Sequence, residues 1–190
     1  MAAVPPLIPV YFDSALVAKF YLNEPGREAV RRLASESGVV VTSGIAIAEV
    51  SAAFHRKLRE GAVDQPTFKA LQGQFAHDVT HEIWKTIGPT EALLQQVHAL
   101  FLRLDKSVFL RSLDALHLVT AKAERFDRIY SNDRHLLAAC ASLGLEGIDP
   151  TKCPAATSRR VGHAGCPSGS SVGPARRAAT SAARLGMPVI

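Results

Sequence analysis

The sequence predicts an α/β fold in which a central, mostly parallel sheet of about four to five short strands carries helices on both faces. Short apolar runs rich in branched residues, which favour strands, alternate along the chain with amphipathic segments of helical period. Strands separated by helices pair in parallel, because each crossover returns the chain to the same edge of the sheet. The 190 residues are 47% hydrophobic, as in ordinary globular proteins. We therefore expect one core-forming domain over residues 1–150.

The expected strands are brief apolar stretches bounded by turn-forming or helix-capping residues. The first, "LIPVYF", directly precedes an acid, and the third, "HEIWKTI", alternates only imperfectly between apolar and polar positions. The others are "VVVT", "RIYS" and "LEGID". Together the five expected strands cover residues 7–12, 39–42, 81–87, 128–131 and 145–149.

The expected helices follow these strands and are bounded by capping residues. They cover residues 14–22, 27–37, 45–60, 65–79, 90–104, 113–126 and 133–144. Ser43 and Asp64 are suited to cap the third and fourth helices, and Ser112 to open the sixth. Gly61 and Gly144 stand where the third and seventh helices should end, a position that favours the left-handed conformation of glycine.

The basic charge of the sequence belongs to its last forty residues. Residues 151–190 contain six basic and no acidic residues, whereas residues 1–150 hold 16 basic and 17 acidic ones. The last segment is also rich in Ala, Gly, Ser and Pro and has no aromatic residue, which predicts a disordered tail. That tail is either a basic arm that adds salt-sensitive affinity for RNA or DNA, or an extension or shifted reading frame without a selected role.

Cysteine usage and hydropathy favour a cytoplasmic protein. The three cysteines, Cys140, Cys153 and Cys166, include no C-x-x-C pair, so no disulfide framework is expected. A zinc site made of Cys153, His163 and Cys166 would match no common ligand spacing. No run approaches the roughly 18 apolar residues of a membrane span, and the first residues lack the features of a signal peptide. We expect no membrane association.

Four acids fall where expected strands end or helices begin. Asp13 follows the first strand and Asp133 the fourth, and open parallel sheets bind ligands beyond the carboxyl ends of their strands. Glu49 lies among small apolar residues with no base three or four positions away, and Asp114 lies on an otherwise apolar helix. Taken singly, each acid can be a helix cap or dipole partner, and Asp114 can pair with Arg111.

If the four carboxylates converge, they require a cation or protons. Two unit charges about 4 Å apart repel by about 4 kcal/mol at an effective dielectric constant of about 20. Oxygen ligands without histidine or cysteine at zinc spacing select Mg²⁺ or Mn²⁺. Arg111 and His117, three residues before and after Asp114, would then contact phosphate or position a water. The chemistry that such a site supports is hydrolysis of a phosphodiester by a metal-activated water.

Four segments carry a resemblance to a known family: "YFDSALVAKFYLNEPG", "AIAEVSAAF", "RSLDALHLVTA" and "RIYSNDRHLLAACASLGLEGIDP". In this order and spacing they resemble PIN-domain ribonucleases, specifically the VapC-type toxins of bacterial toxin-antitoxin pairs. The likeness covers residues 7–150 and implies a three-layer PIN-like fold. It also implies site residues, which are Asp13, Glu49, Asp114 and Asp133 as catalytic metal ligands and Ser14, Arg111 and Ser131 in support.

The resemblance further implies an activity and partners. Similar proteins cut RNA under Mg²⁺ or Mn²⁺, as homodimers whose site an antitoxin protein blocks with a basic side chain. All four acids are present, so the sequence shows no sign of a degenerate site. Arg111 and Arg134 would form a basic rim around this acidic site, which reconciles RNA binding with the near-neutral charge of residues 1–150.

Three other functions stay open at the level of sequence. The chain could be a non-catalytic, nucleic-acid-binding PIN-like module whose acids only cap helices. It could be a free-standing RNA-processing nuclease without an antitoxin. A phosphoryl-accepting domain with Asp13 as acceptor would need paired acids after the first strand and a lysine after a later one, and "YFDS" and "IYSND" supply neither cleanly.

Overall fold

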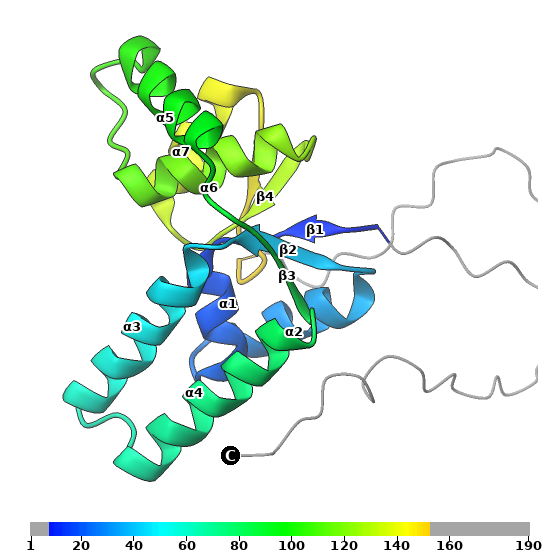
Figure 1. Cartoon of the computed structure of the whole chain (residues 1–190), viewed down its shortest axis with the longest axis vertical. Coiled ribbons are helices and arrows are strands. Elements are labelled where there is room, and N and C mark those ends of the chain that lie inside the picture. The colour runs from blue at the N-terminus through cyan, green and yellow to red at the C-terminus, as the bar shows by residue number, and fades with distance from the viewer. Residues whose placement is uncertain (1–7, 153–190) are drawn as a thin grey trace, which may run out of the picture.

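A parallel sheet of five short strands forms the middle layer of the computed structural model, which describes residues 8–152 (Figure 1). One part of the sheet has the order β1-β2-β3, and the other pairs β4 with β5. An isolated parallel bridge between Phe12 and Tyr130 joins β1 to β4. The strands are β1 (Val10–Tyr11), β2 (Val40–Ser43), β3 (Trp84–Ile87), β4 (Arg128–Tyr130) and β5 (Glu146–Ile148).

Helices cover both faces of this sheet, as the sequence predicts (Figure 1). One group consists of α1 (Ser14–Tyr21), α2 (Arg27–Glu36), α3 (Ala46–Arg59) and α4 (Gln65–Thr80). The other group consists of α5 (Glu91–Arg103), α6 (Ser112–Ala123) and α7 (Arg134–Ala139), which a 3-10 turn over Cys140–Leu143 follows. The three-layer α/β architecture is therefore confirmed.

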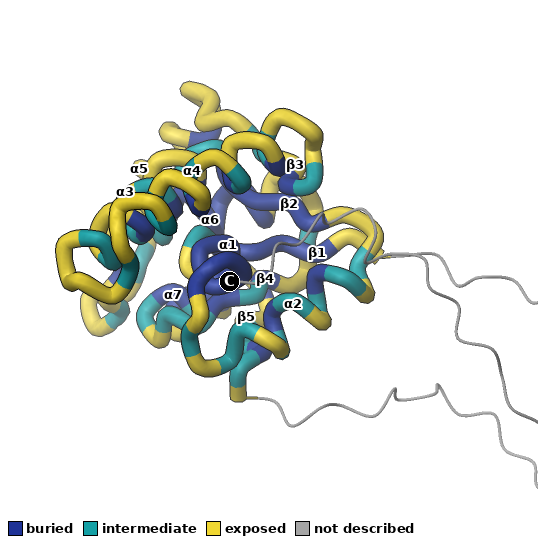
Figure 2. Tube along the Cα trace, turned by 90° about the horizontal axis from the view of Figure 1, so that it is seen from below, coloured by how far each residue is buried: buried dark blue, intermediate teal, exposed yellow. Residues whose placement is uncertain are grey.

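The alternation of side chains along the strands divides the interior into two cores. Val10, Phe12 and Val40 pack with α1 to α4, whereas Tyr11 and Val41 pack with α5 to α7. This division follows from the strand geometry, since successive side chains point to opposite faces of a sheet. In Figure 2 the strands β1 and β2 and most of α1 are buried, whereas the outer helices expose one side.

Most expected boundaries hold, and one cap is wrong. Asp64 caps α4 by accepting the Thr67 N–H at 2.9 Å, and Gly144 follows the 3-10 turn with φ of 64°. Ser43 does not cap α3. It is the last residue of β2, because the pairing with β3 extends to Ile87, and α3 begins three residues later without a side-chain cap. The expected helix over 133–144 breaks into α7 and the 3-10 turn.

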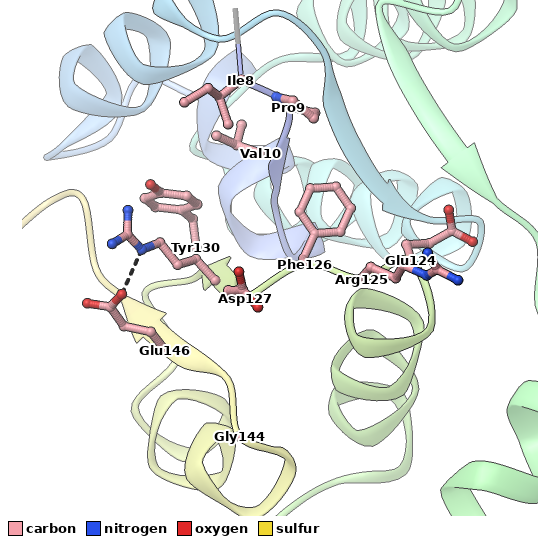
Figure 3. Close-up of a pocket in the computed structure, with 11 residues that line it drawn as sticks. Ile8, Pro9, Val10, Glu124, Arg125, Phe126, Asp127, Tyr130, Gly144 and Glu146 are labelled. Carbon is pink, nitrogen blue, oxygen red and sulfur yellow. Dashed lines mark hydrogen bonds and ion pairs between the residues drawn. The ribbon is translucent and has the colours of Figure 1, made fainter.

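A pocket of about 560 Å³ lies at the amino ends of β1, β4 and β5 (Figure 3). Val10, Phe126 and Tyr130 contribute apolar surface, and Arg128 and Glu146 form an ion pair at 2.6 Å across it. This pocket is at the opposite end of the strands from the four acids singled out in the sequence, and none of those acids lines it. It is therefore not the site that the sequence predicts.

Two further expectations concern membranes and the tail. Within residues 8–152, none of the helices combines the length and the apolar character needed to cross a bilayer. Cys140 is a free, buried thiol. The predicted disordered tail beyond Lys152 and the weighed zinc site of Cys153, His163 and Cys166 lie outside the described residues.

Candidate active site

Asp13 lies at the carboxyl end of β1 and is 3% exposed. One of its oxygens caps α1 by accepting the Leu16 N–H at 2.9 Å, so the capping interpretation is correct as far as it goes. The other oxygen accepts the Ser131 hydroxyl at the end of β4. Burial raises the pKa of Asp13 to about 6, against the opposing effects of His117 and of the Ser131 hydrogen bond. Asp13 is thus a buried carboxylate that is costly to ionise.

Asp133 joins Asp13 through the same serine. The Asp133 N–H donates to the Ser131 hydroxyl at 2.9 Å. One oxygen of Asp133 caps α7 by accepting the N–H groups of His135 at 2.7 Å and Leu136 at 3.2 Å. Its other oxygen faces the Arg111 guanidinium at 3.5 Å. The sequence therefore placed Asp133 and Ser131 correctly at the carboxyl edge, since parallel strands end on the same side.

Glu49 on α3 is held by Ser14 and His117. The Ser14 hydroxyl donates to Glu49 Oε2 at 2.6 Å, and His117 Nε2 lies 3.1 Å from the same oxygen. A carboxylate can only accept, so Nε2 carries a hydrogen, and the Tyr11 hydroxyl lies 3.2 Å from Nδ1 on the other side of the ring. Burial alone would raise the pKa of Glu49, but the bonds from His117 and Ser14 outweigh it and lower that pKa.

Asp114 stands in the first turn of α6 and has a buried oxygen without a partner. Its Oδ2 accepts no hydrogen bond within the described residues. Burial raises the pKa of Asp114, and the nearby carboxylates of Asp133 and Glu49 raise it further, whereas Arg111 opposes them. Buried carboxylate oxygens are costly when unpaired. Among the four acids of this cluster, Asp114 is therefore the one with a buried oxygen that no group of residues 8–152 hydrogen-bonds.

Hydrogen bonds and electrostatic interactions connect the four predicted acids. Ser131 links Asp13 to Asp133, and Asp114 is coupled electrostatically to Asp13, Asp133 and Glu49. All four acids offer carboxylate oxygens, which are the ligands that hard divalent cations prefer. No group of three or more His, Cys, Asp or Glu side chains in residues 8–152 is already arranged to hold a metal ion. The fit to a metal therefore rests on donor chemistry and on the unpaired Asp114 oxygen.

Comparison with known proteins identifies the family. The sequence profile described as "PIN domain" matches residues 10–141. The chain belongs to the PIN domain family. PIN domains form a nuclease superfamily, so the cluster of acids lies in a nuclease fold. No curated protein sequence matches the chain significantly.

Solved structures share the PIN fold at low sequence identity. One is VapC20 of Mycobacterium tuberculosis, described as a toxin that cleaves the sarcin-ricin loop, with a TM-score of 0.55, 17% identity, and coverage of 68% of this chain and 94% of that one. FitAcB from Neisseria gonorrhoeae gives a TM-score of 0.58 at 13% identity, covering 76% of this chain and 99% of that one. Identities this low establish the shared fold alone.

Two interpretations of the α6 segment are wrong in this PIN domain. His117 was expected to contact phosphate or position a water, but it is 1% exposed and is bound to Glu49 and Tyr11. Arg111 was weighed as an ion-pair partner for Asp114, and it pairs with Asp133 instead. The sequence analysis also missed Tyr11, for which the only signal was its place at the end of the first strand.

Replacing His117 with leucine is expected to destabilise the fold by roughly 1.5–3 kcal/mol, because the charged Glu49 and the buried Tyr11 hydroxyl each lose a partner. His117→Gln retains a donor for Glu49 and should lose less. Urea unfolding at neutral pH measures both. His98→Leu, on the exposed side of α5, is the control and should shift stability by no more than about 0.5 kcal/mol. Equal stability of His117→Leu and wild type would show that this contact is not maintained.

Proposed function

We propose that this PIN domain is a Mg²⁺- or Mn²⁺-dependent endoribonuclease and the toxin of a toxin-antitoxin pair. One observation carries the proposal: four carboxylates from four distant parts of the chain lie near the carboxyl edge of the sheet, and a buried Asp114 oxygen among them has no hydrogen-bond partner within residues 8–152. The pKa values of Asp13 and Asp114 are raised, chiefly by burial and further by neighbouring carboxylates, and a divalent cation in the cluster would remove the repulsion between these charges.

Each residue of the site has a separate task in the proposed reaction. Asp13, Glu49, Asp114 and Asp133 would hold the metal, which when bound supplies a water of lowered pKa and neutralises charge on the phosphate oxygens. Ser131 orients the Asp13 carboxylate, and Ser14, together with His117, fixes that of Glu49. Arg111, whose side chain is 60% exposed beside Asp133, is placed to bind a phosphate of the RNA.

The substrate and partners belong to the same proposal. A likeness in fold to a toxin that cleaves an RNA loop supports RNA as the substrate and an antitoxin protein as the partner. Exposed Arg111 and Arg134 border the acids and offer positive charge to the RNA backbone. A homodimer, implied by the resemblance, and a cytoplasmic location, expected from cysteine usage and hydropathy, stay predictions.

The experiment that tests this function is cleavage of total RNA by the purified chain. We expect fragments with Mg²⁺ or Mn²⁺, none with EDTA, and restored cleavage when the metal is added back. RNA binding without cleavage at any metal concentration would favour the non-catalytic module, and cleavage that EDTA leaves unchanged would refute the metal-dependent mechanism. Growth arrest on expression, relieved by a small DNA-binding protein encoded next to the gene, separates a toxin from a free-standing RNA-processing nuclease.

A further inference from the structure

Phe109 is an exposed aromatic ring that belongs to neither core. It lies between α5 and α6 and is 57% exposed, although its neighbour Leu110 is buried. The Arg111 guanidinium lies over the ring, with Cζ 5.9 Å from its centroid. On another side, the ring of His135 meets it edge to face, with centroids 4.7 Å apart. The contacts with Arg111 and His135 fix the orientation of the Phe109 ring, but more than half of the residue stays exposed to solvent.

Both residues whose side chains meet this ring also contact an acid of the candidate active site. The Arg111 side chain pairs with Asp133 at 3.5 Å, and the backbone N–H of His135 donates to the other oxygen of Asp133 at 2.7 Å. The exposed Arg134 donates to His135 Nε2 at 3.2 Å and extends the positive charge along the same edge. The Arg111 side chain therefore connects the Phe109 ring to Asp133, one of the proposed metal ligands.

We propose that Phe109 is a stacking platform for an unpaired nucleobase of the RNA, next to the phosphate that is cleaved. The inference rests on the proposed nuclease function and adds a side chain that would bind a base of the substrate. Bases stack on exposed aromatic rings, and the adjoining phosphates bind arginines, which is how proteins take up single strands without reading their sequence. Arg111 and Arg134 are the arginines available beside Phe109.

The surroundings favour a nucleobase over an apolar protein side chain as the occupant. The side chains that meet the ring are a guanidinium and an imidazole, so a purely apolar partner would remove water from the Arg111 charge without offering it a counter-charge. A nucleotide instead brings an apolar base for the ring and an anionic phosphate for the arginine. In duplex RNA the bases are paired and stacked within the helix, so they cannot reach the ring.

The test uses the full chain carrying Asp13→Asn, with EDTA present, so that binding is measured without cleavage. The probe is a short single-stranded RNA containing 2-aminopurine, whose fluorescence falls when it stacks. Phe109→Ala should weaken binding by roughly 5- to 150-fold and remove the quenching. Phe109→Trp should restore both. Phe109→Leu should restore neither, because leucine lacks a π face. Leu94→Ala, which removes an apolar side chain of similar exposure (52%) on α5, should leave binding unchanged.

Activity of the otherwise wild-type enzyme gives a second readout. With Mg²⁺, Phe109→Ala should raise KM for the single-stranded RNA while changing kcat less. The platform is refuted if Phe109→Ala binds like Leu94→Ala, or if Phe109→Leu binds as well as Phe109→Trp, which would indicate a docking point for an apolar protein partner. Failure of the platform leaves wild-type cleavage intact. Failure of the nuclease proposal abolishes cleavage but not the aromatic-dependent quenching, so the two failures are distinguishable.

Discussion

Asp13→Asn is expected to lower metal-dependent RNA cleavage by roughly 10²–10⁴-fold, because a metal-binding carboxylate supplies several kcal/mol of transition-state stabilisation. The amide keeps an oxygen that can accept the Leu16 N–H, so the cap on α1 is retained. Its NH₂ group can face the Ser131 oxygen. The variant should therefore fold and bind RNA while losing activity. Cleavage of a defined RNA under single-turnover conditions measures the loss.

Asp64→Asn is the matched control for this experiment. Asp64 caps α4 by the same kind of bond that Asp13 makes to α1, an N–H donated by the residue three positions later, at 2.9 Å in both cases. Asp64 is exposed and is not one of the four acids of the candidate active site. Its substitution should leave cleavage unchanged. Full activity of Asp13→Asn would mean that Asp13 serves only as a cap and that the cleaving site lies elsewhere.

The same variant is expected to be more stable than the wild type at neutral pH when no metal is present. Burial raises the pKa of Asp13 from 3.8 to about 6, so the folded protein binds more protons than the unfolded chain between these values. Stability therefore falls as pH rises through this window. Above it, the ionised Asp13 costs the wild type on the order of 3 kcal/mol, which asparagine does not incur. Most of the advantage should disappear below about pH 4.

Urea unfolding of both proteins in EDTA, from pH 4 to pH 7.5, measures this difference, and the other acids cancel in the comparison. Adding Mg²⁺ or Mn²⁺ at about 100 times its dissociation constant should stabilise the wild type by about 2.7 kcal/mol and Asp13→Asn by much less. A variant that is less stable than the wild type at every pH would contradict the cost assigned to the buried charge. Equal stabilisation by metal would show that Asp13 is not a ligand.

What the sequence determined is where the residues of the candidate site lie along the chain. Alternating strand and helix patterns imply a parallel sheet, and such a sheet brings Asp13, Ser131 and Asp133 to one edge because all of its strands end there. The polar Glu49 and Asp114 stand out on otherwise apolar helix faces. These signals are short-range patterns of residue type, and the structure places each of these residues on the kind of element that its pattern predicts.

Only the tertiary structure decided which partner each side chain takes. His117 and Glu49 are 68 residues apart, and their contact depends on where the sheet places α6 and α3, which belong to the helix groups on its opposite faces. Arg111 turns to Asp133 on another element, and Ser43 stays in the sheet because β3 pairs with it. Local pattern cannot predict such choices, because they are set by distances between elements that are remote in sequence. The orientation of Phe109 beside Arg111 and His135 depends on the same long-range packing.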